Sequence, residues 1–289
     1  MIRLDLDKVA YSVYPTLYIG ASPCLESRMP LVPLFLYTPL NIYISNYLNA
    51  RISIYKKYKT MDSFLIHDTR FKAILGPNPT LDLLLENKDY AFAHEAGVFI
   101  PADNTLFITG NHIHTTAGER TVQISKVTLS RNHDGVVSAT CEELPSSEIP
   151  MGNGGVNYQD NSSVLFCAQG SAQLPSGLYQ MSTRHPHDVK LVSGNFYGRP
   201  FNSVNDVVVH SDGAIWFTDP VYGFEHGYRP EPSLPGQIYR FVPETGAVRS
   251  LADGFVKPNG ICFSPDEKTV YVTDTARFRC HGVVEEGRV

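Results

Sequence analysis

Cysteine is scarce in this chain, and so are clusters of positive charge. The 289 residues include 5 Cys, whose spacing fits neither a disulfide framework nor a zinc pattern. The net charge is −5, and Lys and Arg are dispersed except in the stretch 51–59, so we expect no nucleic-acid partner. The sequence has no Gly-rich phosphate loop, serine elbow or Cys–His pair. Composition and motifs therefore give no support to a zinc site, a nucleic-acid interface, a phosphate-binding loop or a serine or cysteine nucleophile.

A long uninterrupted apolar run is missing as well. The most apolar segment, 29–48, contains Pro30, Pro33 and Pro39, whereas a membrane span needs about 20 mostly apolar residues. The segment starts too late for a signal peptide, and no small-x-small cleavage site follows it. We therefore expect no membrane span, and we favour a cytoplasmic location over secretion. Helix signals are also scarce, since only 81–92 could form one or two helical turns, or alternatively an outer strand.

What the sequence does contain is a repeated hairpin. Each copy has a polar residue, a β-rich run, a turn signal and a second β-rich run, and the copies lie at 94–111, 153–170, 204–220 and 258–275. Their polar residues are Glu95, Asn153, Asn205 and Asn259, which are 58, 52 and 54 residues apart. A β-rich unit with this period is typical of a propeller that has one blade per repeat. The polar residues would then point at one central axis.

The segments between the repeats complete the blades. Residues 123–131, 177–182 and 236–246 alternate apolar and polar side chains, as half-buried strands do. Asp212-Gly213 is a strong signal for a two-residue hairpin turn. We therefore predict an all-β propeller of antiparallel four-stranded blades.

The repeats also suggest how the chain is divided. Residues 61–275 would hold about four blades, and propellers usually have four to eight. Either this one has four, or the chain is a fragment of a larger ring, which we favour. Residues 1–60 lack the repeat register, and we expect them to lie outside the fold, as an unstructured extension or wrongly joined sequence. A membrane-surface arm with the basic patch 56–59 is the alternative. Residues 276–289 would form an irregular tail.

Several blocks carry a family resemblance. GRPFNSVNDVVVHSDGAIWFTDPVYGF at 198–224 and VKPNGICFSPDEKTVYVTDT at 256–275 resemble signature blocks of the gluconolactonase / senescence-marker-protein (regucalcin) family. HEAGVF at 94–99 and the NGG block at 153–155 also fit, closest to the fungal lactonohydrolase-like branch, although Ala96-Gly97 stands where a proline is common. The resemblance covers about residues 75–275.

The resemblance implies a six-bladed propeller, incomplete here, with one divalent metal ion, usually calcium, on its axis. It places Glu95, Asn205 and Asn259 at three metal-ligand positions. The fourth ligand, an Asp that is also the proposed catalytic base or nucleophile, would lie beyond Val289. The catalytic residue within this chain is therefore unknown, and its activity is in doubt.

The residue types fit such chemistry. Calcium accepts carboxylate and amide oxygens, and one Glu with two Asn would leave the ion enough positive charge to polarise a lactone carbonyl. We expect Asn153 and His94 to contact the substrate, although Asn153 could instead cap a loop. The leading hypothesis is calcium-dependent hydrolysis of small lactones such as aldonolactones. A related esterase and a non-catalytic or inactive propeller fragment are the alternatives, and the oligomeric state is not predicted.

Other polar residues have simpler interpretations. Asn205 and Asn259 could be ordinary turn residues. Asp206 should point away from Asn205 and form structural hydrogen bonds. We interpret Asp219 and Asp274 as turn and inter-blade hydrogen-bonding residues rather than catalysts. The pair His112 and His114 could bind a metal from one strand face, but no third ligand follows at a fitting distance, so a solvated loop is favoured.

Overall fold

The computed structural model describes most of the chain after residue 64. The described residues are 64, 66–77, 79, 82–115, 119–133, 135–145 and 147–276, together with the backbone of 42–45.

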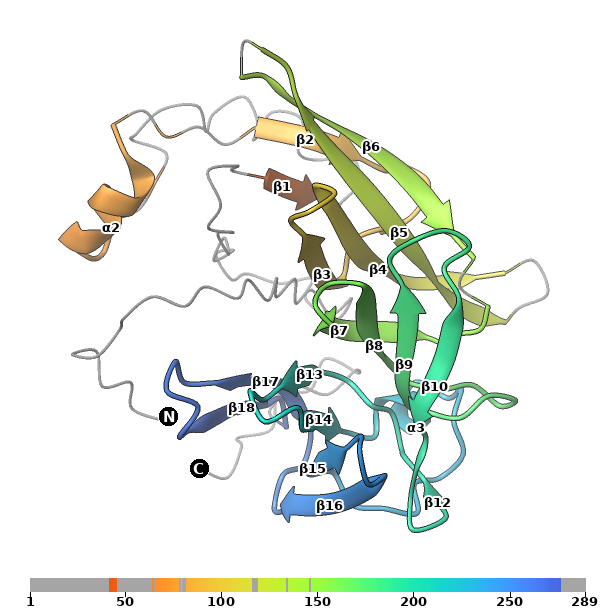
Figure 1. Ribbon diagram of the computed structural model, residues 1–289. Coiled ribbons are helices and arrows are strands. Elements are labelled where there is room, and N and C mark those ends of the chain that lie inside the picture. The colour runs from red at the N-terminus through yellow and green to blue at the C-terminus, as the bar shows by residue number, and fades with distance from the viewer. Residues whose placement is uncertain are drawn as a thin grey trace.

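Three four-stranded antiparallel sheets and one hairpin follow one another along the chain (Figure 1). The first sheet contains β3 (Glu95–Ile100), β4 (Thr105–His114), β5 (Arg120–Arg131) and β6 (Val137–Leu144). The second contains β7 (Gly152–Tyr158), β8 (Ser163–Ala168), β9 (Gly177–Ser182) and β10 (Val189–Ser193). The third contains β13 (Val207–Val209), β14 (Ile215–Asp219), β15 (Gln237–Val242) and β16 (Ala247–Ala252), and the hairpin contains β17 (Pro258–Phe263) and β18 (Val270–Asp274).

Each strand in these sheets pairs with the next one in the sequence, as in the blades of a propeller. The all-β class and the antiparallel four-stranded sheets are therefore confirmed. The first strands of successive sheets lie next to one another, because β3 contacts β7, β7 contacts β13, and β13 contacts β17. The sheets form an arc with these strands on its inner side (Figure 1). A closed ring of six blades stays a prediction.

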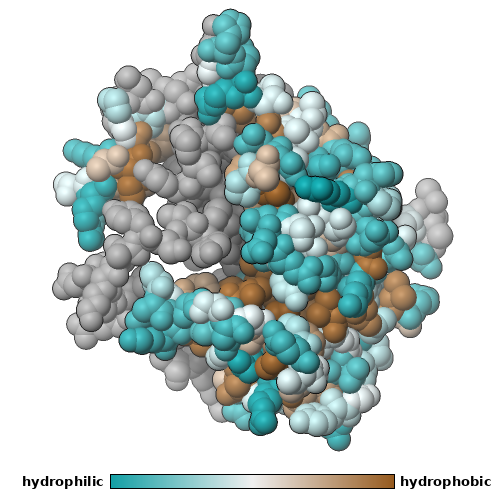
Figure 2. Space-filling view, in the orientation of Figure 1, coloured by the Kyte–Doolittle hydropathy of each residue, from teal (hydrophilic) through white to brown (hydrophobic). Residues whose placement is uncertain are grey.

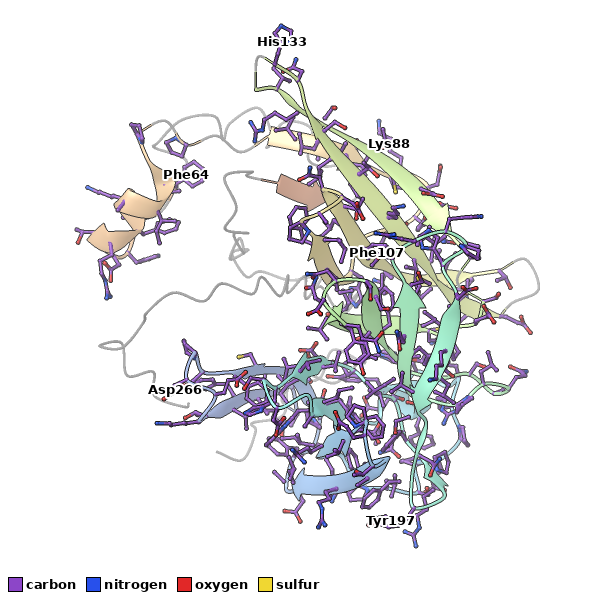
Figure 3. The ribbon with its side chains drawn as sticks, in the orientation of Figure 1. Phe64, Lys88, Phe107, His133, Tyr197 and Asp266 are labelled. Atoms are coloured by element: carbon purple, nitrogen blue, oxygen red, sulfur yellow. The ribbon has the colours of Figure 1, made fainter. Side chains whose placement is uncertain are left out.

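The core lies between the sheets, and β8 shows how one strand supplies two interfaces. Val164 and Phe166 pack in a cluster with the first sheet, which includes Phe107 (Figure 3). The alternate residues Leu165 and Cys167 pack in a cluster with the third sheet. Successive side chains of a strand point to opposite faces, so every residue of β8 is buried. Figure 2 shows apolar residues gathered where the second and third sheets meet, on a surface that is otherwise largely hydrophilic.

The remaining elements are short. The hairpin β11 (Asn195–Phe196) and β12 (Arg199–Pro200) carries Tyr197 at its tip (Figure 3). The one-turn helix α3 (Tyr222–Glu225) follows β14, and α2 (Thr69–Leu75) is capped by the Asp68 side chain, which accepts a hydrogen bond from the Arg70 amide at 2.8 Å. No helix in the described part of the chain is long and apolar enough to cross a membrane.

The structure decides between the two alternatives expected for the segment before β3. Within 81–92 the chain forms the strand β2 (Asp82–Glu86), not helical turns. β2 lies beside β6 and pairs in parallel with β1 (Ile42–Ser45). β1 belongs to the segment 1–60, of which the other residues lie outside the described part, as do 277–289. The division into 1–60, 61–275 and 276–289 therefore stays a prediction.

Candidate functional site

The four repeated polar residues lie at the starts of the inner strands. Glu95 is the first residue of β3, Asn153 and Asn259 are the second residues of β7 and β17, and Asn205 comes two residues before β13. Three of these strands have an irregular register at this place, between Ala96 and Val98, between Gly152 and Gly155, and between Pro258 and Ile261. Such bulges redirect side chains and are common next to functional sites.

Hydrogen bonds tie the neighbouring strand starts together. The Thr109 hydroxyl, from the residue that pairs with Glu95, donates to the Asn153 carbonyl at 2.8 Å. The Gly154 amide donates to the Asn205 carbonyl at 2.9 Å. The Thr218 hydroxyl donates to the Asn259 carbonyl at 2.6 Å. These hydrogen bonds to backbone carbonyls therefore hold the four positions in one contiguous row, whereas ligation of a common metal ion by their side chains stays a prediction.

Glu95 is a buried carboxyl group in an unfavourable environment. Its side chain is 11% exposed, and burial, with a further contribution from the charge of Asp206, raises its pKa well above the usual range. His94 Nε2 lies 4.0 Å from Glu95 Oε1, but burial lowers the pKa of His94 to about 4. At neutral pH the imidazole is thus uncharged, so the contact is not an ion pair. The carboxylate form of Glu95 would be favoured by a cation.

Two of the asparagine side chains have contrasting surroundings. Asn153 Oδ1 is buried and has no hydrogen-bond partner among the described residues, which fits a site for a cation or a substrate donor. Asn259 Nδ2 donates to the Tyr222 hydroxyl at 3.0 Å. Burial is the main cause that raises the pKa of Tyr222 above its usual value.

The residue types also limit what could hold a metal. Within the described ranges, no three His, Cys, Asp or Glu side chains are placed to bind one. A metal site formed by these residues would therefore need amide oxygens, which is the kind of ligand set that the sequence predicts. A buried carboxyl group, an unpartnered amide oxygen and further amides on adjacent strands fit a hard cation such as calcium.

Asp206 has a structural role. Its carboxylate accepts hydrogen bonds from the Val207 and Ile261 amides, both at 2.9 Å. It therefore joins β13 to β17, which confirms the interpretation of Asp206 as a hydrogen-bonding residue.

Asp219 and Asp274 hold the loops that lead into the inner strands. Asp219 accepts from the amides of Asn202 at 2.9 Å and Ser203 at 2.7 Å. Asp274 accepts from two amides, those of residues 256 and 257, at 3.0 and 2.9 Å. In both cases the loop belongs to the same sheet as the aspartate, so these are contacts within a blade and not between blades. Burial raises the pKa of Asp219 to about 7, although the two amides lower it.

A group of rings near the site escaped prediction. The His112 ring centroid lies 5.4 Å from that of His226 and 5.6 Å from that of Tyr228, and Arg120 donates to the His226 carbonyl at 2.6 Å. Burial is the main cause that lowers the pKa of His112 to about 4. His112 thus belongs to β4 and packs against the segment after β14, so its assignment to a solvated loop is wrong, whereas His114 is exposed. The density of His and Tyr at 222–228 was the available signal.

Known proteins resemble this chain over the same region. Residues 92–283, which include all the candidate site residues, match the family described as SMP-30/Gluconolactonase/LRE-like region. The lactonohydrolase oryL of Aspergillus oryzae is 33% identical over 227 residues, which are 74% of this chain and 47% of that protein. The gluconolactonase of Zymomonas mobilis is 36% identical over 90 residues, which are 30% of this chain and 25% of that protein.

A solved structure is also similar. The gluconolactonase XC5397 of Xanthomonas campestris has a TM-score of 0.46 and 28% identity, over 66% of this chain and 56% of that one. The chain thus spans about half the length of the lactonohydrolase and of this structure. Because the family match covers most of the chain and extends across the three sheets and the hairpin, the chain belongs to the SMP-30/gluconolactonase/LRE-like family.

Proposed function

We propose that this chain contributes the site of a calcium-dependent hydrolase that acts on small lactones such as aldonolactones. Its family and its relatives, a lactonohydrolase and a gluconolactonase, support the reaction class. The observation that carries the metal dependence is the environment of Glu95. Its carboxyl group is buried, the charge of Asp206 acts on it, and amide side chains begin the adjacent inner strands. A divalent cation would compensate the charge that makes this burial unfavourable.

In this proposal Glu95, Asn205 and Asn259 hold the ion through their side-chain oxygens, since calcium prefers oxygen ligands. These three ligands carry one formal negative charge, so the ion would keep much of its positive charge. Asn153 Oδ1 would accept a hydrogen bond from a substrate hydroxyl, which its buried and unpartnered state supports. His94 is uncharged at neutral pH and would bind the substrate through a neutral hydrogen bond.

A bound calcium ion would supply polarisation of the lactone carbonyl and stabilise the negative charge that develops on its oxygen. In this proposal the protein residues bind and orient the substrate. Attack on the carbonyl also needs a base, and none is assigned. Asp206, Asp219 and Asp274 already accept hydrogen bonds from backbone amides.

The engagement of these aspartates favours a second candidate function, a propeller that binds calcium and a small ligand without turning it over. Fold and family alone do not choose between the two.

Calcium titration and lactone hydrolysis test both candidates. Calcium binding is measured by calorimetry, and hydrolysis of glucono-1,5-lactone is followed with calcium and with a chelator. Glu95→Gln should lower calcium affinity at least about tenfold, because affinity depends on ligand charge. Glu142→Gln is the control, since Glu142 on β6 has a side chain that is 63% exposed and should not affect binding. Equal calcium affinity in wild type and Glu95→Gln would refute the metal site. Calcium binding without hydrolysis would support the second candidate.

A further inference from the structure

Tyr222 connects a short helix to the candidate site. It is the first residue of α3, in the segment that follows β14, and its ring is stacked on His226 with the centroids 6.1 Å apart. Its hydroxyl group contacts β17 and the residue after β18, where it bonds the Asn259 side chain and the Thr275 hydroxyl. The ring is thus held on one side while the hydroxyl meets a proposed metal ligand on the other.

The hydrogen bonds around this hydroxyl have one consistent direction. The chain of bonds ends on the Lys257 carbonyl, which can only accept, and the Thr275 hydroxyl donates to it at 3.4 Å. A hydroxyl has one hydrogen to donate, so the Tyr222 hydroxyl must in turn donate to Thr275. The Tyr222 oxygen can then only accept a hydrogen bond from Asn259. The end of the carboxamide that faces Tyr222 must therefore be the nitrogen, Nδ2, which lies 3.0 Å away.

This direction matters because the two ends of a carboxamide are nearly identical in shape and opposite in function. The oxygen can bind a cation, whereas the NH₂ group cannot. The backbone of Asn259 is held independently, since its carbonyl accepts from Thr218 and the next amide, that of Gly260, donates to the Thr273 hydroxyl at 2.9 Å. Tyr222 acts on the side chain, through its contact with Nδ2.

We infer that Tyr222 is a positioning residue: with Thr275 it holds Asn259 Nδ2, and thereby turns Asn259 Oδ1 toward the cation bound with Glu95. This inference rests on the proposed function and deepens it. Neither Tyr222 nor Thr275 needs to contact the ion. Hydrogen-bond partners that orient ligands typically change metal affinity by about 10–100-fold when they are removed.

Two variants and a matched control test the inference. Tyr222→Phe keeps the ring and removes the acceptor. Thr275→Val keeps the shape and removes the acceptor of the Tyr222 hydrogen, which lets that hydroxyl donate to Asn259 Oδ1 and favours the reversed carboxamide. Tyr228→Phe is the control, because this tyrosine belongs to the same segment but its hydroxyl donates to Gln169.

Two measurements are made on the full chain. Calcium affinity is measured by calorimetry, and the Asn259 side-chain amide signals are followed by NMR without calcium, assigned by their absence in Asn259→Ala. We expect Tyr222→Phe and Thr275→Val each to weaken calcium binding about tenfold and to shift these signals. The double variant should be about as weak as either single variant, because both break the same chain of bonds. Tyr228→Phe should change neither quantity.

The outcomes separate this inference from the proposed function. If Glu95→Gln abolishes calcium binding while Tyr222→Phe and Thr275→Val leave it unchanged, the metal site stands and the positioning role is refuted. A lower melting temperature with unchanged calcium affinity would assign Tyr222 a structural role only, and would also refute it. If the wild-type chain binds no calcium, both proposals fail, whatever the NMR signals show.

Discussion

Gly154 is the position where the packing of the inner strands can be tested most directly. A Cβ atom on Gly154 would lie 2.6 Å from the Asn205 carbonyl oxygen, 2.7 Å from Asp206 Oδ1 and 3.0 Å from Asp206 Cα. Carbon and oxygen atoms normally approach no closer than about 3.3 Å. Two of the three atoms are backbone, so the Gly154→Ala methyl group must push β7 away from the segment that leads into β13. The same carbonyl oxygen accepts the Gly154 amide at 2.9 Å, and that bond would be stretched.

The expected cost follows from these contacts. Overpacking of this kind costs about 1–3 kcal/mol, and a weakened hydrogen bond adds about 0.5–1.5 kcal/mol. The free energy of unfolding should therefore fall by about 2–4 kcal/mol. In a domain of this size, each kcal/mol lowers the melting temperature by about 2–4 °C. Because Asn205 is displaced as well, calcium affinity should drop about tenfold.

Urea unfolding followed by circular dichroism measures the first effect, and calorimetric titration with calcium measures the second. Gly194→Ala is the control, because its new Cβ atom would lie 3.3 Å from Cδ2 of Leu191, a half-exposed side chain that can move. It should cost less than about 1 kcal/mol. If Gly154→Ala were as stable as Gly194→Ala and bound calcium normally, β7 and the Asn205–Asp206 segment could not be packed this closely.

Three further predictions concern charge, hydrogen bonding and turnover. Without calcium, the melting temperature should fall as pH rises above about 4.3, the ordinary pKa of a glutamate, because folded Glu95 holds its proton to higher pH than the unfolded chain does. When melting temperatures are measured over a pH series with chelator, Glu95→Gln should show a smaller decrease than wild type. An equal decrease in the two proteins would contradict the role of Glu95. Thr218→Val removes a hydroxyl that donates to the Asn259 carbonyl and accepts from the Asp206 amide, and should cost about 1–3 kcal/mol in urea unfolding; a stable variant would refute the importance of this link. Calcium-dependent hydrolysis of an aldonolactone by residues 1–289 should be slow or absent, because the aspartates near the site are engaged with backbone amides. Fast turnover that Glu95→Gln abolishes would show that a base is present after all.

Much of the fold could be predicted because its signals are local. The Asp212-Gly213 turn signal and the β-rich runs on either side of it predict a hairpin, and β13 and β14 form one with Gly213 at a φ of 84°. The prediction of a two-residue turn is wrong, because the His210 amide donates to the Ala214 carbonyl and the loop between them holds residues 211–213. The alternation of residues in 177–182 predicts the strand β9 with the correct bounds. By contrast, α2 was missed, because its formation depends on the Asp68 cap at 68–70 more than on any apolar periodicity.

The site was only partly predictable, because its contacts join distant residues. The repeat register placed Asn205 and Asn259 at equivalent positions. It could not predict that Asp206 bonds the amide of Ile261, 55 residues away, or that Tyr222 reaches Asn259 across 37 residues. Such pairs have no sequence spacing of their own, since they depend on which strands become neighbours when the sheets pack.

The aspartates that end β14 and β18 show both the local sequence signal and its limit. Asp219 holds the amides three and two residues before Asn205, and Asp274 holds those three and two residues before Asn259. The same pair of local hydrogen bonds therefore sets the path of the backbone that leads to Asn205 and to Asn259. Each aspartate stands at the same place in its repeat, so the sequence pattern contains this feature. The repeat does not determine the distance between Asn205 and Asn259. That distance depends on Asp206 and Thr218, which link one sheet to the next. Repetition thus supplies equivalent positions for the two asparagines, and the contacts between sheets decide how those positions lie relative to each other.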